Sequence, residues 1–257
     1  MTTETDRTPV STLTRPDAVI EVSQLTKSFG TNHVLRAFDL TLNQGENLVV
    51  LGKSGSGKSV LIKCIIGLML PDQGQIQVLG QDVTSLTHDD LDQLRARVGF
   101  LFQSNALYDS MTVRQNLEFP LRRHWLDQSR GEVNDLVMEA LDNVGLTHTV
   151  DMMPVELSGG MRKRISLART LILKPEIILY DEPTTGLDPI TAKEINNLIV
   201  SIQDKYNTSA IIISHDMKCV QMTANRVAML IDGRCYGIGT YDQLRQSPDD
   251  QINDFFE

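Results

Sequence analysis

The stretch Gly52-Lys53-Ser54-Gly55-Ser56-Gly57-Lys58-Ser59 decides the fold of this 257-residue chain. It lies between a short apolar run, residues 47–51, and the apolar sequence VLIKCIIGLML, residues 60–70. The first run is typical of a buried strand and the second of a buried helix. Glycines allow such a loop to wrap its backbone N–H groups around an anion, because a Cβ would obstruct the backbone angles required. The order of strand, glycine-rich loop and helix predicts a phosphate-binding loop, or P-loop, in an α/β fold.

The loop predicts a polyphosphate site and a role for its last residues. Lys58 is expected to neutralise the β- and γ-phosphates, and the Ser59 hydroxyl is expected to bind Mg²⁺. The following helix points the positive end of its dipole at the phosphates. A glycine-rich turn without a ligand is the alternative, and the flanking strand and helix argue against it. The predicted nucleotide contacts from this segment are Gly52, Lys53, Ser54, Gly55, Ser56, Gly57, Lys58, Ser59 and Val60.

Two adjacent carboxylates, Asp181 and Glu182, directly follow a further apolar strand pattern, residues 177–180. Taken alone the pair says little, because acidic residues commonly end strands. In a chain that also contains a P-loop, such a strand places one carboxylate next to a metal ion and the other beside the γ-phosphate. We therefore expect Asp181 to bind Mg²⁺ and Glu182 to accept a proton from the attacking water.

The composition disfavours several classes of protein. Lys and Arg number 24 and Asp and Glu 33, and the resulting net charge of −9 disfavours direct binding to nucleic acid or to an anionic membrane surface. The longest apolar run, residues 60–70, is interrupted by Lys63 and is shorter than the roughly 18 residues that span a bilayer. Three cysteines without a CxxC pair favour a reducing compartment.

The chain is predicted to hold one domain behind a flexible tail. Residues 1–17 are polar and contain two prolines, which predicts the tail, and residues 18–257 form the domain. Strand patterns over 19–22 and 34–42 open it, and helical periodicity predicts an inserted helical subdomain over about residues 104–175. The other predicted elements are helices over 81–97, 133–144, 162–172 and 191–202, strands over 98–102 and 210–213, a hairpin across Asp232-Gly233 and a final helix from Tyr241. Strands that alternate with helices favour a mostly parallel sheet.

The segment Leu157-Ser158-Gly159-Gly160-Met161 predicts a second anion site, with Ser158 as helix N-cap and glycine amides exposed behind it. With this segment in place, the chain resembles the ATP-binding subunits of ABC transporters, whose signature motif it matches. The other family elements follow in the right order: Gln103 as the Q-loop residue, Thr184 to Asp188 (TTGLD) as the D-loop, and His215 as the switch histidine.

The resemblance implies a P-loop NTPase core with an antiparallel β subdomain and an inserted helical subdomain. It also implies a head-to-tail homodimer that binds ATP and Mg²⁺, each nucleotide lying between one P-loop and the signature segment of the other copy. The implied catalytic residues are Lys58, Gln103, Glu182 and His215, and the implied metal ligands are Ser59, Gln103 and Asp181. The further implied nucleotide contacts are Phe29, stacked on adenine, and Ser158, Gly159, Gly160 and Asp188.

A narrower resemblance concerns the transported substrate. Met161 stands where most of the family has Gln, and together with residues 101–122 it resembles the MlaF-type ATPases of MCE-linked phospholipid transport systems. This implies a dimeric integral membrane permease docked near residues 103–122, an MCE-domain partner, and a peripheral position on the cytoplasmic face of the inner membrane. The basic residues 162–164 are interpreted as a solvated helix face.

Three alternatives differ in what they require of the sequence. The ATPase of a small-solute importer stays open, because the catalytic half of the molecule is shared. An ABC ATPase that acts on DNA or ribosomes is disfavoured by the acidic charge and by the short separation of Lys58 from Ser158, which leaves no room for a long coiled coil. A regulatory subunit without catalysis is disfavoured because Glu182 and His215 are both present.

Overall fold

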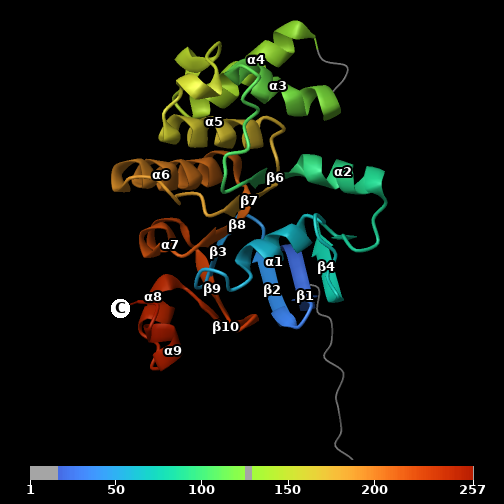
Figure 1. The fold of residues 1–257 in the computed structure, drawn as a ribbon, viewed down its shortest axis with the longest axis vertical. Coiled ribbons are helices and arrows are strands. Elements are labelled where there is room, and N and C mark those ends of the chain that lie inside the picture. Colours follow the sequence, from blue (N-terminus) through green and yellow to red (C-terminus); the bar gives the residue numbers. More distant parts are fainter. Residues whose placement is uncertain (1–16, 125–128, 257) are drawn as a thin grey trace, which may run out of the picture.

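The computed structural model describes residues 17–124 and 129–256 (Figure 1). The strands are β1 (Ala18–Phe29), β2 (Asn32–Asn43), β3 (Asn47–Leu51), β4 (Gln73–Val78), β5 (Gln81–Asp82), β6 (Val98–Leu101), β7 (Ile177–Asp181), β8 (Ser209–Ser214), β9 (Arg226–Ile231) and β10 (Arg234–Gly239). The helices are α1 (Lys58–Ile65), α2 (His88–Arg97), α3 (Val113–His124), α4 (Arg130–Asn143), α5 (Gly159–Leu171), α6 (Pro189–Tyr206), α7 (Met217–Thr223), α8 (Tyr241–Arg245) and α9 (Asp250–Asn253), with 3₁₀ turns at Thr147–Thr149 and Pro154–Glu156. Except for Asp17, the predicted tail lies outside the described residues.

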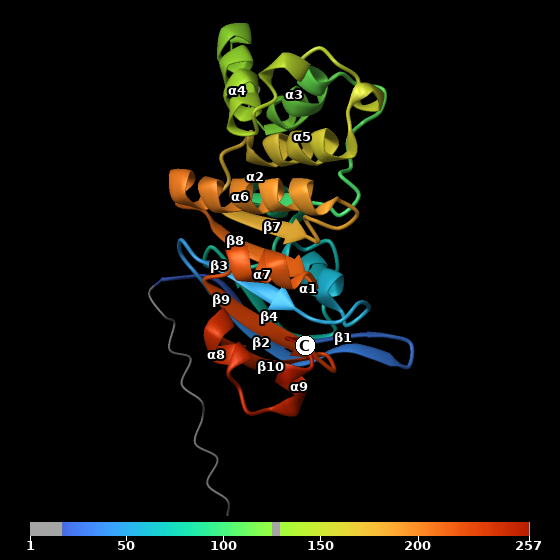
Figure 2. The same ribbon diagram turned by 90° about the vertical axis from the view of Figure 1, so that its left-hand side faces the viewer.

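A six-stranded sheet with the order β10-β9-β3-β8-β7-β6 forms the centre of the molecule. Its strands are parallel except for β10, which pairs antiparallel with β9 at the edge. Val49 and Leu51 of β3 pack on the face covered by α5, α6 and α7, and Leu48 and Val50 pack on the opposite face with α1. Figure 2 shows α6 and α7 on the near face. Because both faces are covered, the strands are continuous apolar runs, and their carboxyl ends meet at one edge.

A second, antiparallel sheet has the order β2-β1-β4-β5 and shares the core on the α1 side. The strands predicted near residues 19–22 and 34–42 are confirmed as β1 and β2, and both are longer than predicted. Strand β4 is absent from the prediction, although Ile76 and Val78 alternate with polar residues and are buried. It pairs with β1 and with β5, so β1 and β4 are the two inner strands of this sheet.

Helices α3, α4 and α5 lie together at one end of the molecule, beyond the parallel sheet (Figure 1). Leu117, Leu141 and Ile165, one from each helix, are fully buried in the same core as the sheet residues. In the part of the chain that the structure describes, no helix is both long and apolar enough to span a bilayer.

Several predicted helix boundaries are wrong for local reasons, and a predicted turn is confirmed. The helix predicted over 81–97 begins only at His88, after its N-cap Thr87, and Gln81–Asp82 form β5 instead. Helix α1 ends at Ile65, before residue 70, because the chain turns at Gly67 with φ +67°. Helix α5 begins directly after Ser158, whose hydroxyl caps it. The predicted final helix is divided into α8 and α9. The hairpin across Asp232 and Gly233 is present, with φ +50° and +77° as a type I′ turn requires.

Candidate functional site

The P-loop connects the carboxyl end of β3 to α1 and has no room for side chains at two of its glycines. A Cβ on Gly52 would lie 2.7 Å from Ser56 Oγ and 2.8 Å from the Leu230 carbonyl oxygen. A Cβ on Gly57 would lie 2.7 Å from Val34 Cγ1, and this glycine also has φ +104°. The loop therefore presents backbone rather than side chains, which is what a polyphosphate cradle requires.

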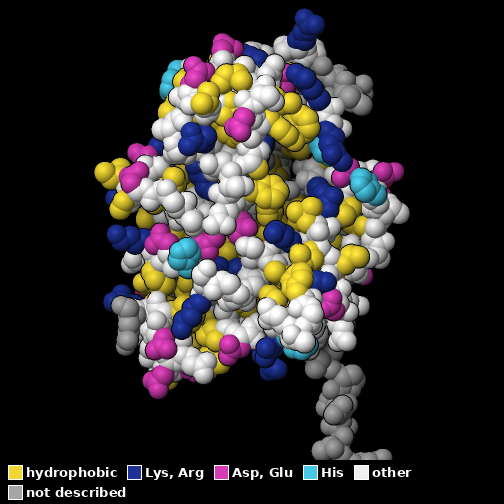
Figure 3. All heavy atoms as spheres, viewed as in Figure 1, with side chains coloured by type: hydrophobic (Ala, Val, Ile, Leu, Met, Phe, Trp, Pro, Cys, Tyr) yellow, Lys and Arg dark blue, Asp and Glu magenta, His cyan; other side chains and the backbone are white. Residues whose placement is uncertain are grey.

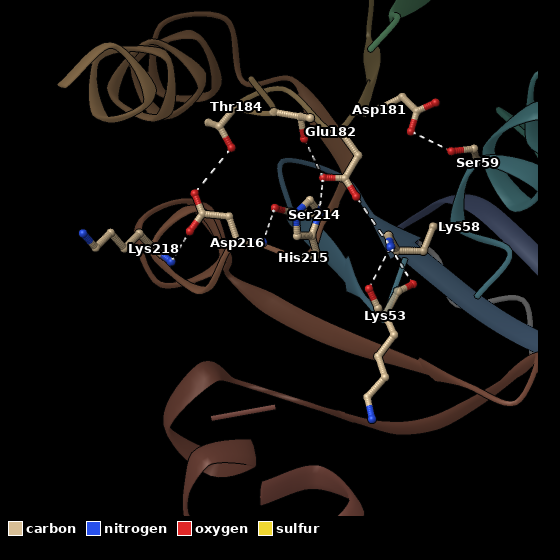
Figure 4. Close-up of polar contacts among 12 residues, drawn as sticks. Lys53, Lys58, Ser59, Asp181, Glu182, Thr184, Ser214, His215, Asp216 and Lys218 are labelled. Carbon is tan, nitrogen blue, oxygen red and sulfur yellow. Dashed lines mark hydrogen bonds and ion pairs between the residues drawn. The ribbon is translucent and has the colours of Figure 1, made fainter. Parts of the chain in front are cut away.

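Lys58, the first residue of α1, is buried beneath this loop with only 5% of its surface exposed (Figure 4). Its Nζ donates hydrogen bonds to the carbonyl oxygens of Gly52 (2.7 Å) and Lys53 (3.0 Å). The same Nζ lies 3.5 Å from Glu182 Oε1 at the end of β7. The Lys58 ammonium group is thus fixed against the loop backbone. It lies next to the Glu182 carboxylate, which follows β7, and β7 is two strands away from β3 in the sheet.

Glu182 and His215 follow the neighbouring strands β7 and β8 and meet at their carboxyl ends (Figure 4). His215 Nδ1 lies 2.8 Å from Glu182 Oε2, which also accepts a hydrogen bond from Thr185 Oγ1 at 3.2 Å. Glu182 is 8% exposed and has φ +50°, an uncommon angle for a residue with a side chain. The structure therefore brings Lys58, Glu182 and His215 into one contact network.

Ser59 and Asp181 form a second pair at the same edge. Ser59 Oγ donates a hydrogen bond of 3.0 Å to Asp181 Oδ1. Burial raises the pKa of Asp181, and its hydrogen bond from Ser59 partly offsets this shift. Two converging oxygen donors, one on a buried carboxylate that a cation would stabilise, fit the ligands that Mg²⁺ prefers.

Gln103 and Phe29 lie outside this contact network. Gln103 follows β6, the sheet neighbour of β7, and is exposed; within the described residues its side chain forms no hydrogen bond. Phe29 ends β1 with 48% of its surface exposed, and Lys27 Nζ lies 5.7 Å from its ring centroid. The sequence missed Val34, which packs on the P-loop at Gly57, because its position on β2 carries no local signal.

The signature segment begins α5 as predicted, with Ser158 as its N-cap. Ser158 Oγ accepts a hydrogen bond from the Met161 N–H at 3.2 Å. Gly159 has open space where a Cβ would be, whereas a Cβ on Gly160 would lie 2.6 Å from Thr191 Cγ2. Asp188 caps α6 through the N–H groups of residues 190 and 191, and hydrogen bonds from Thr191 lower the pKa of its carboxyl group. Gly160 is therefore also a packing residue, which joins the signature segment to the start of α6.

This packing predicts different effects of alanine at the two glycines. Gly160→Ala is expected to destabilise the fold by about 1–3 kcal/mol, because the added methyl group overlaps Thr191. Gly159→Ala is the matched control and is expected to change stability by no more than about 0.5 kcal/mol. Urea unfolding of both variants measures the difference. Equal stabilities would contradict the packing role of Gly160.

The interpretation of residues 162–164 as a solvated face is wrong for Lys163, which is 2% exposed. Its Nζ donates hydrogen bonds to the carbonyl oxygens of Gln103 (3.1 Å) and Phe102 (3.4 Å). Burial lowers the pKa of Lys163 to about 8, against the opposing attraction of Asp181 and Glu182. The sequence did not indicate that Lys163 is buried and its basic neighbours are not. Helical spacing alone does not identify which face of α5 packs against the segment after β6.

The known proteins that this chain is similar to differ in the function that their names give. The family model described as ABC transporter matches residues 35–185. The chain is 39% identical to the probable ribonucleotide transport ATP-binding protein Mkl of Mycobacterium tuberculosis, over 92% of this chain and 66% of that protein. It is 36% identical to the intermembrane phospholipid transport system ATP-binding protein MlaF of Haemophilus influenzae, over 93% and 90% of the two chains. It is also 36% identical to the methionine import ATP-binding protein MetN of Rhizobium johnstonii, over 92% and 65%.

The solved structures agree with the fold. The chain superposes with a TM-score of 0.79 and 28% identity on the ATP-binding cassette MJ0796 in a dimeric post-hydrolysis state bound to ADP and Pi, over 86% of this chain and 98% of that one. The predicted P-loop core is therefore confirmed. The family match extends over more than half of the chain and includes the P-loop and the carboxylates after β7. The chain thus belongs to the ABC transporter family, and the domain that it spans is an ATPase of that family.

Proposed function

We propose that this chain hydrolyses ATP at a site shared by two copies, and that hydrolysis powers phospholipid transport between membranes through a partner permease. The observation that carries the catalytic part is the contact network from Lys58 through Glu182 to His215. Glu182 is nearly buried and held by His215, so its carboxylate can orient and deprotonate a water that attacks the γ-phosphate. Lys58 offsets charge on the β- and γ-phosphates, and His215 contacts the γ-phosphate.

The remaining P-loop residues and Phe29 bind the nucleotide in this proposal. Backbone N–H groups of residues 52–60 cradle the phosphates, and the exposed ring of Phe29 stacks on adenine. Ser59, Asp181 and Gln103 are the residues that hold Mg²⁺. When bound, the ion neutralises negative charge on the phosphate oxygens.

The second half of each site comes from the other copy. Ser158, Gly159 and Gly160 lie at the N-terminus of α5, where helix N–H groups point outward and favour an anion. Asp188 lies next to this segment through the contact of Thr191 with Gly160. The dimeric structure of the MJ0796 cassette supports a dimer of this chain, and the proposal arranges its two copies head to tail.

A groove of about 600 Å³ between α2 and α3 supports a permease contact. Phe102, Tyr108 and Phe119 line it with roughly 40% of each surface exposed, and the rings of Tyr108 and Phe119 lie 4.9 Å apart. On the face drawn in Figure 3, hydrophobic side chains lie beside basic ones at the level of α2 and α3. The basic side chains on the groove are His88, Arg95, Arg123, His124 and Arg169, and the acidic Asp92 also lines it and pairs with Arg95 and Arg123. The partner that this surface fits is an apolar helix that carries acidic residues. Several residues that line the groove are close to Gln103 in the sequence.

Phospholipid is the proposed cargo because the similarity to MlaF extends over almost the full length of both proteins. The ATPase of a small-solute importer is the second candidate, which the similarity to MetN favours. In either case the chain binds the cytoplasmic face of the inner membrane through the permease and does not bind nucleic acid. An MCE-domain protein is the further partner in the phospholipid case.

The test captures the complex from native membranes through a tagged Glu182→Gln variant, which is expected to retain ATP. Co-purified proteins and lipids are then identified by mass spectrometry. A permease with an MCE-domain protein and enriched phospholipid supports the proposal. A permease with a soluble-solute receptor and no enriched lipid supports the importer instead.

The groove predicts the effect of one surface change in the same experiment. Phe119→Asp is expected to reduce the captured permease by about tenfold or more, because a charge replaces an aromatic contact. Its ATP hydrolysis without the permease should stay unchanged. Ile238→Asp on β10 is the matched control, since Ile238 is similarly exposed and lies outside the groove. Full capture by the Phe119 variant would exclude this groove as the permease contact.

A further inference from the structure

One face of α5 is hydrogen-bonded to the backbone of β6 and of the segment that follows it. Four side chains at helical spacing donate hydrogen bonds to its carbonyl oxygens: Lys163 to Phe102 and Gln103, Ser166 to Asn105, Arg169 to Asn105 and Ala106, and Thr170 to Phe100. The distances lie between 2.8 and 3.4 Å. We call this set the α5 ladder. Because every acceptor is a main-chain oxygen, the ladder fixes the path of residues 100–106 whatever their side chains are.

Lys163 is the member of the ladder nearest to the nucleotide site and the most costly to bury. It is 2% exposed, and its hydrogen-bond partners are neutral carbonyl groups rather than a carboxylate. A buried ammonium group without a bonded counter-charge costs stability, whereas neighbouring buried positions on α5, Ile165 and Leu167, are apolar. Packing alone therefore does not account for a lysine here.

The position of Lys163 connects three parts of the site. Its helix begins at the signature segment, its Nζ bonds to the backbone of Gln103, and its charge interacts with Asp181 and Glu182. We propose that Lys163 is a positioning residue that holds the backbone of Gln103 at a fixed position relative to Asp181 and Glu182 at the end of β7. Movement of α5 is then transmitted to Gln103 through the main chain. The inference rests on the proposed role of Gln103 in ATP turnover.

A double-mutant cycle tests the inference with the full chain and MgATP. Lys163→Met keeps an unbranched side chain and removes the donor, and it is combined with Gln103→Ala. Each single change is expected to lower kcat by about tenfold while the Kd for ATP stays within about twofold. If Lys163 acts through Gln103, the double variant turns over no more slowly than Gln103→Ala alone. Losses that multiply would overturn the inference.

Other variants separate positioning from stability. Lys163→Arg retains a donor and a charge and should recover most of the lost kcat. Thr170→Val removes the ladder hydrogen bond farthest from Gln103 and should lower Tm without lowering kcat. Lys205→Met on α6 removes an exposed positive charge that bonds to Asn143 rather than to the ladder, and it should leave kcat unchanged. If Thr170→Val lowers kcat as much as Lys163→Met does, the ladder acts by general stability and the inference is wrong.

Two outcomes distinguish this inference from the function on which it rests. If Gln103→Ala alone has wild-type kcat, the proposed role of Gln103 fails and the positioning role fails with it. If Gln103→Ala is impaired and Lys163→Met has wild-type kcat, only the positioning role fails. If Lys163→Met does not fold, the cycle uses Lys163→Gln, which keeps a neutral donor but a shorter reach.

Discussion

Glu182→Gln is expected to lower the rate of ATP hydrolysis by about 100-fold or more, because a carboxamide cannot accept the proton of the attacking water. The amide oxygen and nitrogen can still bond to His215 and Thr185, which now contact the carboxylate. The shape of the site is therefore retained, and the affinity for ATP should change little. Phosphate release measures the rate, and binding of a fluorescent ATP analogue measures the affinity.

Glu139→Gln on α4 is the matched control for this variant. Glu139 also contacts a lysine, with Lys174 Nζ 2.9 Å from its Oε2, but it lies on the helical end of the molecule. Its replacement should leave the rate unchanged. Hydrolysis by the Glu182 variant at the wild-type rate would remove Glu182 as the general base.

Ser158→Arg and Lys58→Met are each expected to abolish hydrolysis, and a mixture of the two is expected to recover it in part. In a head-to-tail dimer, a mixed pair contains one complete site, formed by the intact P-loop of one copy and the intact signature segment of the other. If the copies pair at random, about a quarter of the wild-type rate per site should return. Phosphate release by each variant alone and by the refolded or co-expressed mixture provides the measurement.

The control for Ser158→Arg must separate the loss of a helix cap from the loss of the site. Ser129→Arg serves this purpose, because Ser129 caps α4 as Ser158 caps α5. Loss of either cap costs about 1 kcal/mol of stability. Only the Ser158 variant should lose hydrolysis. If the mixture stays as inactive as the two variants alone, each site is built within one copy and the shared-site proposal is wrong.

The main elements of the fold and half of the site were predictable because they depend on local patterns. Continuous apolar runs identified β3, β7 and β8, and glycines identified the loop before α1. Since parallel strands end at one edge of a sheet, residues placed directly after them meet there. This is why Lys58 contacts Glu182, Glu182 contacts His215, and Ser59 contacts Asp181.

Two of the predictions that failed depended on partners distant in the sequence, whereas the helix boundaries failed for local reasons. Strand β4 is short and half polar, and its assignment as a strand depends on pairing with β1. The burial of Lys163 depends on carbonyl groups some sixty residues earlier in the chain. The single final helix failed because α8 and α9 are separate short helices, each begun by its own cap, Thr240 and Asp249.

The sequence by itself determined the chemistry of this protein, since the order of P-loop, signature segment, paired carboxylates and histidine specifies a nucleotide site. Only the tertiary structure decided how the parts are connected: Gly160 against Thr191, Val34 against Gly57, and Lys163 against the backbone of Gln103. The physical reason is the range of the interactions. Backbone propensity and apolar periodicity act over a few residues, whereas these contacts arise when separate elements pack into one core.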